Sequence, residues 1–294
     1  MGHVVQHAHA PFMSRTGALR IHQIPAWQDN LIWLAECMKT GDVAVIDGPE
    51  AGPTLAYLHT NGLKLTTIFN THTHGDHIGI NRDLGKRGLL DGLRVVGSKL
   101  APTDIPGLTE EVVDGQCITF GACKGEVILT EGHINGHVSY LFDGVLFCGD
   151  TLFAGGCGYL FDGPPAKMYR SLKRLAALDG DTFVCCAHEY TQDNLRFAFS
   201  VDPHNEALKT RIRDVWIRRS RGECVVPSTM ALERATNPFM QFGASRLAKM
   251  VAKAMPGTDL GSEANLFAAT RNLKDRKDYR ALDDSSLPLL TRHP

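Results

Sequence analysis

The sequence predicts an α/β protein in which layers of β-sheet are covered by helices and followed by a smaller, all-helical domain. From residue 18 to about residue 188, short β-rich runs alternate with glycine-containing turns and a few helical patterns. Beyond Tyr190 the β-rich runs disappear and helical patterns follow one another. We therefore predict three segments: a disordered N-terminal tail over 1–18, an α/β domain over 19–190, and a helical domain over 191–294.

Six β-rich runs define the predicted sheets, and one helix lies among them. The fifth run contains Asp143 and Gly144, a dipeptide typical of a two-residue hairpin turn. A helical pattern over 165–178 places Met168 and three leucines on one face. The β-rich runs cover 43–48, 66–72, 93–98, 125–133, 137–150 and 182–189.

Four helical patterns make up the predicted helical domain. Pro203 stands near the start of the first, where its fixed φ suits the first turn of a helix. The patterns cover 202–219, 228–234, 245–254 and 262–274.

The composition is that of an ordinary globular protein. Its 294 residues are 43% hydrophobic, which is enough for a sizeable core, and 31 basic residues nearly balance 32 acidic ones. This balance gives no overall field to attract nucleic acid or an anionic membrane. No run approaches the roughly 18 apolar residues that span a bilayer. We therefore expect a monomer that acts on a small molecule, without nucleic acid or membrane as a partner.

The cysteines and the N-terminal residues bear on the cellular compartment. Eight cysteines occur without a CxxC pair, mostly inside apolar runs, which predicts reduced thiols and a cytoplasmic location. No acidic residue precedes Asp29, so an organelle-targeting peptide in the tail is the alternative.

The stretch NTHTHGDHIGI, over 70–80, carries three histidines and an aspartate within six residues. It is either a solvated, histidine-rich loop or part of a metal site. His133, Asp150 and His188 favour the metal site, because each is the first strongly coordinating side chain after an apolar run. The full candidate set is His72, His74, Asp76, His77, His133, Asp150 and His188.

The spacing of these residues favours two ions. His72 and His74, two apart beyond a strand, can bind one ion, while Asp76 and His77 can turn toward a second. Asp150 is the expected bridge, because a carboxylate has two oxygens to share. The ligand types suit zinc, iron or manganese, and we expect two divalent ions per chain, with zinc as the first choice.

Several motifs together resemble one enzyme family. THTHGDH resembles the signature of the metallo-β-lactamase superfamily, and CGDTLFAGGCGYLFDG, AHEYTQDNL, VPSTMALERATNPFM and RNLKD are similar to glyoxalase II, the hydroxyacylglutathione hydrolases. The resemblance runs from about residue 19 to residue 274. It implies a metallo-β-lactamase αββα sandwich followed by an all-helical domain that binds the thiol carrier, glutathione.

The resemblance also implies an activity and a set of metal ligands. The family hydrolyses S-(2-hydroxyacyl)glutathione, such as S-D-lactoylglutathione, to glutathione and a 2-hydroxy acid, here D-lactate, in the second step of methylglyoxal detoxification. A hydroxide shared by the two metals is the implied nucleophile, and Asp76 and Asp150 are the implied catalytic carboxylates beside it. The implied ligands are His72, His74 and His133 for one metal, Asp76, His77 and His188 for the other, and Asp150 for both.

The implied carrier-binding residues are Tyr190 and, in the helical domain, Arg271 and Lys274. Three residues apart on a helix, Arg271 and Lys274 share a face and can clamp a carboxylate. A solvated basic helix face is the alternative for that pair. Tyr159 and Phe161 are further predicted substrate-binding residues, but they stand where the family commonly has a lysine and a tyrosine. Losing those polar groups removes contacts worth on the order of 1–3 kcal/mol each.

Three alternatives follow from the residues that depart from the pattern or remain open. The enzyme could use a different thiol carrier, or it could be a persulfide dioxygenase of the same fold that holds one iron. A non-hydrolytic metal-binding or nucleic-acid-processing protein is the third. Asp29 and Asn30 match a family pair near the metal pocket, and we expect them and His137 to support the ligands without binding metal.

Overall fold

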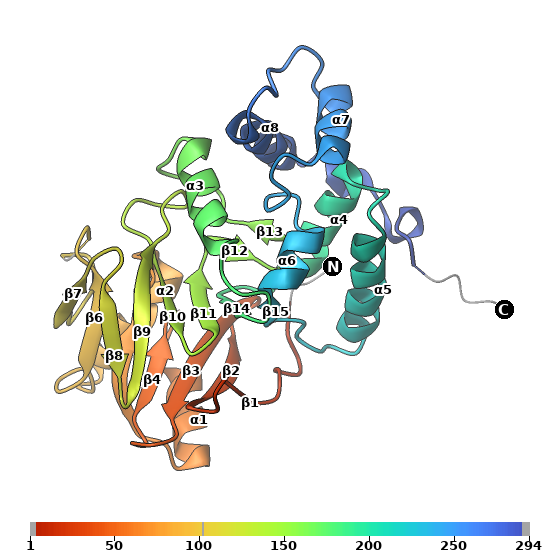
Figure 1. Cartoon of the computed structure of the whole chain (residues 1–294). Helices are drawn as coiled ribbons and strands as arrows, with labels where there is room; N and C mark the ends of the chain where they lie inside the picture. The colour runs from red at the N-terminus through yellow and green to blue at the C-terminus, as the bar shows by residue number, and fades with distance from the viewer. Residues whose placement is uncertain (1–3, 102, 290–294) are drawn as a thin grey trace.

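Two β-sheets packed face to face form the larger part of the molecule, and helices cover their outer sides (Figure 1). The computed structural model describes residues 4–101 and 103–289. The predicted αββα sandwich with a helical domain after it is confirmed. The first sheet has the order β1 (Phe12–Met13), β2 (Leu19–Ala26), β3 (Asn30–Cys37), β4 (Val43–Ile46), β5 (Leu65–Phe69), β6 (Arg94–Ser98) and β7 (Glu110–Val112).

The second sheet brings together strands that are distant in sequence. Its pairing is antiparallel except between β11 and β14, which run parallel. A separate hairpin joins β12 (Leu152–Phe153) to β13 (Gly156–Cys157). The order of the second sheet is β15 (Ser228–Thr229), β14 (Phe183–Cys186), β11 (Val145–Gly149), β10 (Val138–Phe142), β9 (Cys123–Leu129) and β8 (Cys117–Phe120).

The two faces of β3 pack against different layers. Leu31 and Trp33 belong to the core between the sheets, where Trp33 Nε1 donates to the carbonyl of Cys186 at 2.9 Å. Ile32 and Leu34 point the other way, into the core beneath α1 (Gly52–Asn61) and α2 (Gly75–Lys86). Side chains alternate across a strand, so a strand covered on both faces is apolar at nearly every position.

Every predicted β-rich run contains a strand of the structure. The run over 137–150 holds β10 and β11, which pair as an antiparallel hairpin. Asp143 and Gly144 form its turn with φ angles of 45° and 76°, the left-handed pair that a two-residue type I′ turn requires. The predicted helix over 165–178 is α3 (Pro165–Leu175), and Met168 on its predicted inner face is fully buried.

Over residues 191–289, five α-helices form the helical domain and lie together beyond one end of the sandwich (Figure 1). The patterns over 245–254 and 262–274 correspond to α7 and α8. The prediction was wrong at Pro203, because α5 is capped by Asn205, whose side chain accepts from the Leu208 N–H at 3.1 Å. It also omitted α4. The helices are α4 (Thr191–Val201), α5 (Glu206–Ser220), α6 (Met230–Thr236), α7 (Ser245–Ala254) and α8 (Glu263–Arg276).

The N-terminal tail, predicted to be disordered over 1–18, is ordered from residue 4 onward; residues 1–3 lie outside the described part of the chain. Phe12 pairs with Ile21 of β2, and its ring packs 4.7 Å from that of Phe183. The backbone N–H groups of Gln6 and His7 both donate to the carbonyl of Gly222 at 3.0 Å. Phe183 and Gly222 come from distant segments, so the local composition could not reveal these contacts.

Two predictions about the chain as a whole can be compared with the structure. All eight cysteines are free thiols, as predicted. Within 4–101 and 103–289, no helix combines the length and the apolar character that crossing a membrane would demand. The domain boundary near residue 191 stays a prediction, although α4 begins at Thr191.

Candidate active site

The structure brings all seven predicted ligands together at one end of the sandwich. His72 and His74 follow β5, and His74 is the residue before the first turn of α2, which carries Asp76 and His77. The other three follow strands of the second sheet: His133 after β9, Asp150 directly after β11, and His188 after β14. Five of the seven therefore lie just beyond strands, and the other two lie in the first turn of α2.

The first group of donor atoms has the spacing of one tetrahedral site. His74 Nδ1 lies 3.1 Å from His72 Nε2 and 3.0 Å from His133 Nε2, and His133 Nε2 lies 3.4 Å from Asp150 Oδ2. A tetrahedral ion with bonds of about 2.0–2.1 Å separates its donor atoms by about 3.3–3.4 Å. These four side chains therefore fit a single divalent ion.

The second group has the same spacing and uses the other oxygen of Asp150. Asp150 Oδ1 lies 3.4 Å from both His77 Nε2 and His188 Nε2, and Asp76 Oδ2 lies 3.3 Å from His188 Nε2. His77 Nε2 and Asp150 Oδ1 are buried and have no hydrogen-bond partner among the described residues. Buried polar atoms are rarely left without a partner, so a cation between them accounts for both.

His77, His133 and His188 turn Nε2 toward the predicted ions. Their other ring nitrogen, Nδ1, contacts an acceptor that orients the ring. His77 Nδ1 lies 3.0 Å from Asp47 Oδ2, and His188 Nδ1 lies 2.8 Å from Asp29 Oδ1. His133 Nδ1 contacts the carbonyl of Tyr159 at 2.7 Å. An acceptor at Nδ1 keeps the proton there and leaves Nε2 free to bind a metal.

The residues predicted to support the ligands do so. Beside Asp29, the amide of Asn30 donates to Asp76 Oδ2 at 3.2 Å. The ring of His137 stacks on that of His72 at 4.7 Å, and its Nε2 accepts from the Asp150 N–H at 3.2 Å. His137 therefore lies behind the ligands and fixes the backbone of Asp150.

Asp47 was missed by the sequence analysis. It follows the apolar strand β4, in the same relation to its strand as Asp150 to β11, so the signal that identified Asp150 was present for Asp47 too. Both its oxygens are engaged: Oδ1 accepts from the Thr71 N–H at 2.8 Å, and Oδ2 faces His77. It orients a ligand and ties the loop after β5 to β4.

Replacing Asp47 with asparagine is expected to weaken metal binding about 10- to 100-fold, because an amide holds the His77 ring less firmly than a carboxylate. Competition with a chromogenic chelator measures the change. Asp104→Asn, which alters an exposed carboxylate, is the control and should leave affinity unchanged. Equal affinities for Asp47→Asn and the parent would contradict the orienting role.

The two catalytic candidates carry negative charge in this setting. Burial would raise the pKa of Asp150, but His188 and His77 beside it hold that pKa well below its usual range. Burial likewise opposes ionisation of Asp76, and His188 and His77 lower its pKa well below normal. Both carboxylates are thus available as anions for cations.

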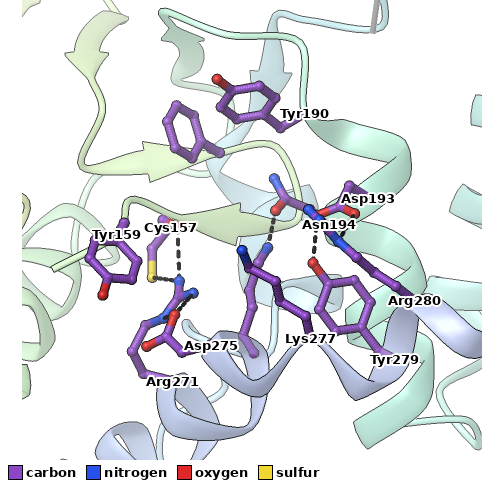
Figure 2. Close-up of a pocket in the computed structure, with 12 residues that line it drawn as sticks. Cys157, Tyr159, Tyr190, Asp193, Asn194, Arg271, Asp275, Lys277, Tyr279 and Arg280 are labelled. Carbon is purple, nitrogen blue, oxygen red and sulfur yellow. Dashed lines mark hydrogen bonds and ion pairs between the residues drawn. The ribbon is translucent and has the colours of Figure 1, made fainter. Parts of the chain in front are cut away.

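A pocket of about 320 Å³ lies between α8 and the segment that carries Tyr190 (Figure 2). Tyr190 lines it, and the Tyr190 ring stacks on that of His188 at 4.8 Å with an angle of only 5° between the planes. Arg271 and Lys274 line its other side from α8. The stacked pair therefore connects the pocket directly to the ligands.

Arg271 and Lys274 share a helix face as predicted, but the alternative of a solvated face is wrong. Their exposed fractions are only 5% and 8%. Arg271 Nη1 donates to the carbonyl of Cys157 at 3.2 Å, and its Nη2 pairs with Asp275 at 2.5 Å (Figure 2). Lys274 Nζ donates to the side-chain oxygen of Asn194. Two buried cations facing one pocket suit an anionic ligand.

Comparison with known proteins agrees with this arrangement. Residues 27–188 match the metallo-β-lactamase superfamily, and residues 189–277 match the family described as "Hydroxyacylglutathione hydrolase C-terminus". The hydroxyacylglutathione hydrolase of Gloeobacter violaceus is 45% identical over 258 residues, which cover 87% of this chain and 99% of that protein. The chain belongs to the hydroxyacylglutathione hydrolase family. The relative from Maricaulis maris is 42% identical over 87% of this chain and 98% of its own.

Solved structures share the fold of this family member. ETHE1 from Myxococcus xanthus superposes with a TM-score of 0.57 at 21% identity, over 85% of this chain and 99% of its own. The B3 metallo-β-lactamase BLEG-1 gives a TM-score of 0.54 at 19% identity, over 75% and 99%. The superfamily fold and the His/Asp groups together imply divalent metal ions in this hydroxyacylglutathione hydrolase family member.

Tyr159 and Phe161, the two departures from the family pattern, lie in different places. Tyr159 lines the pocket, and its side chain is 54% exposed. Phe161 is 61% exposed, and its ring meets those of His74 and His133 edge to face at 5.2 and 5.3 Å. Phe161 thus lies against two predicted metal ligands, whereas Tyr159 lies at the pocket.

The charge of Lys274 predicts a pH dependence. Burial and the neighbouring Arg271 lower its pKa to about 7, against the opposing effect of Asp193. If Lys274 binds an anionic carrier, kcat/KM is expected to fall as pH rises through about 7 and the ammonium is lost. In Lys274→Arg this fall should disappear, because guanidinium stays charged. A pH profile of kcat/KM for both proteins measures this, and identical profiles would contradict it.

The same shift has a consequence for stability. Between pH 7 and about 10.5 the unfolded chain carries a proton on Lys274 that the folded chain has lost. In this window the titration of Lys274 therefore makes the free energy of unfolding rise as the pH rises.

Proposed function

We propose that the chain hydrolyses S-(2-hydroxyacyl)glutathione, such as S-D-lactoylglutathione, to glutathione and the 2-hydroxy acid, as the second step of methylglyoxal detoxification. One observation supports the proposal: the Tyr190 ring, which lines the cationic pocket, stacks on the ring of His188, a proposed metal ligand. A thioester whose carrier fills the pocket reaches the ligands with its acyl end.

Two zinc ions are the proposed cofactors. The donor spacing, the buried unpaired atoms and the imidazole and carboxylate ligand types support them. When bound, such ions acidify water and act as Lewis acids toward a carbonyl oxygen. The proposed holders are His72, His74 and His133 for the first ion, Asp76, His77 and His188 for the second, and Asp150 for both.

The protein's own groups position the substrate. Arg271 and Lys274 are proposed to bind a carboxylate of the carrier, and Tyr190 and Tyr159 flank its path toward the ligands. Phe161 covers His74 and His133 and limits the space beside the acyl group. A departing thiolate has a pKa of about 8.5 and needs little help from an acid, which agrees with a site built from ligands and cations.

The alternative of a mononuclear iron dioxygenase is not favoured. Two complete donor groups are present, and they share the two oxygens of Asp150. The helical domain also matches the hydroxyacylglutathione hydrolase family across 189–277. The proposal further holds that one chain acts alone, because it supplies every donor itself, and that it acts in the cytoplasm, which suits eight free thiols.

The direct test follows S-D-lactoylglutathione by the loss of thioester absorbance, with metal content measured on the same sample. Release of glutathione and D-lactate, lost on treatment with a chelator and restored by zinc, is expected. One iron per chain together with oxygen consumption and no thioester cleavage would overturn the proposal.

Arg271→Ala is expected to lower kcat/KM for S-D-lactoylglutathione by about 10- to 100-fold, mainly through KM, because a charge-assisted contact is worth about 1.5–3 kcal/mol. Arg276→Ala is the matched control, since Arg276 lies on the same helix with about half of its side chain exposed. If Arg271→Ala behaves like this control, the carrier does not bind at α8.

A further inference from the structure

Two cysteines from opposite sheets lie together at the end of the sandwich away from the metal ligands. Cys37 is the last residue of β3, and Cys123 is the first of β9. Ala122, in the tight turn before Cys123, donates its backbone N–H to Cys37 Sγ at 3.3 Å. β3 begins at Asn30, which contacts Asp76, and a strand of this length spans roughly 24 Å. The cysteines are therefore remote from the active site.

The sulfur of Cys37 lies among hydrogen-bond donors. The Thr40 hydroxyl lies beside it, the backbone N–H of Ala122 donates to it at 3.3 Å, and the backbone N–H groups of Thr40 and Lys39 lie nearby. Gly121 allows this approach, because a Cβ there would lie only 2.6 Å from the sulfur. Burial would raise the pKa of Cys37, but these donors stabilise the thiolate and bring the pKa down to about 7.

Cys123 is the natural partner of this thiolate. It directly follows Ala122, whose backbone N–H contacts the Cys37 sulfur at 3.3 Å, and its own sulfur lies 3.9 Å from the carbonyl of Ala18. Burial and the neighbouring Cys37 raise the pKa of Cys123 to about 11, so one thiolate and one thiol lie side by side near neutral pH. Cys185 is buried too, but burial raises its pKa well above the usual value. The donor set thus distinguishes the pair from cysteines that only fill the core.

Only a thin layer covers the pair. Cys37 itself is fully buried, but Thr40, Gly121 and Ala122, which belong to the two turns beside it, are exposed. Turns of this kind open locally at low free-energy cost, which gives a molecule as small as hydrogen peroxide access to the sulfur.

We propose that Cys37 and Cys123 form an oxidation site, at which a peroxide converts the two thiols into a disulfide that joins the two sheets. The Cys37 thiolate attacks one oxygen of hydrogen peroxide, the O–O bond breaks, and hydroxide leaves and takes up a proton. Cys123 then attacks the sulfur of the resulting sulfenic acid, the S–O bond breaks, and water leaves with the Cys123 proton. The two sulfurs lose two electrons, and the peroxide is reduced to two waters.

The disulfide changes stability and leaves catalysis alone. It closes a loop of about 90 residues in the unfolded chain, which restricts that chain far more than the folded one. A rise in Tm on the order of 10 °C is expected. Because the pair is remote from the ligands, thioester hydrolysis should be unchanged, so the inference can fail or succeed independently of the proposed function.

The test treats the metal-loaded full chain with hydrogen peroxide, blocks the remaining thiols, and maps peptides without reduction. A cross-linked peptide containing Cys37 and Cys123, and a rise in Tm that dithiothreitol reverses, are expected. In Cys123→Ser the cross-link and the Tm rise should vanish, and a sulfenic-acid probe should label Cys37. Cys123→Ala, with a smaller and apolar side chain, repeats the test if the serine variant folds poorly.

The exposed Cys117 provides the control. Cys117→Ser should keep both the cross-link and the Tm rise, which excludes disulfides between chains at the surface. The proposal is overturned if peroxide oxidises Cys117 without joining Cys37 to Cys123. It is equally overturned if Cys123→Ser gains the same Tm rise as the parent.

Discussion

Asp150→Asn is expected to lower kcat/KM for S-D-lactoylglutathione on the order of 10³-fold and to reduce the metal content of the purified chain. The asparagine side chain is neutral and offers only one oxygen, whereas Asp150 places Oδ2 in the first donor group and Oδ1 in the second. Activity assays and metal analysis on the same preparation measure both effects.

Two controls make this result specific to the bridging carboxylate. Asp91→Asn alters an exposed carboxylate and should keep full activity and metal content. Asp150→Glu restores the charge but displaces it by one methylene, so it should retain metal better than Asp150→Asn. Parent-like activity in Asp150→Asn would rule out a bridging role for Asp150.

Arg211→Met is expected to lower the free energy of unfolding by about 3–5 kcal/mol. Arg211 is buried, and its Nη2 lies 2.6 Å from Oε1 of the fully buried Glu233. Removing the guanidinium leaves a carboxylate that water cannot reach. Chemical and thermal unfolding measure the loss, which for a chain of this size corresponds to a fall in Tm on the order of 10 °C.

The double variant Arg211→Met/Glu233→Met separates the cost of an unpaired charge from the value of the pair. With both charges absent, most of the lost stability should return, because replacing a buried pair by apolar side chains is often close to neutral. Glu233 also accepts from the Gly155 N–H at 2.8 Å, in the hairpin that carries Cys157. A double variant as unstable as Arg211→Met would show that losing the contacts of Glu233 with Gly155, Ser228 and Asn237 costs as much as the unpaired charge.

The clustering of the seven predicted metal ligands could be anticipated from the sequence because most of them obey a local rule. Each of these follows an apolar run, and strands of a sandwich bring their ends to a common edge. Asp47 obeys the same rule, but its position after a strand does not by itself reveal what its carboxylate contacts. Its role depends on His77, which is 30 residues away.

The features that sequence reasoning missed depend on packing between distant segments. The N-terminal tail is held by Gly222 and Phe183, and no property of the first 18 residues encodes those contacts. α4 was overlooked because Thr191 and Asn194 occupy two of its buried positions, which hides the apolar period. The burial of Lys274, and hence its lowered pKa, likewise comes from segments outside α8.

The short stretch from His188 to Thr191 limits how this enzyme can be recombined with its relatives. It contains a predicted metal ligand, the aromatic ring stacked on that ligand, and the first residue of α4. A chimera that joins a foreign helical domain after residue 190 would combine Tyr190 of this chain with a helix that did not evolve to contact it. Grafts that begin before His188 transfer the ligand, the stacked ring and the helix start as one unit, so such exchanges should preserve activity more often.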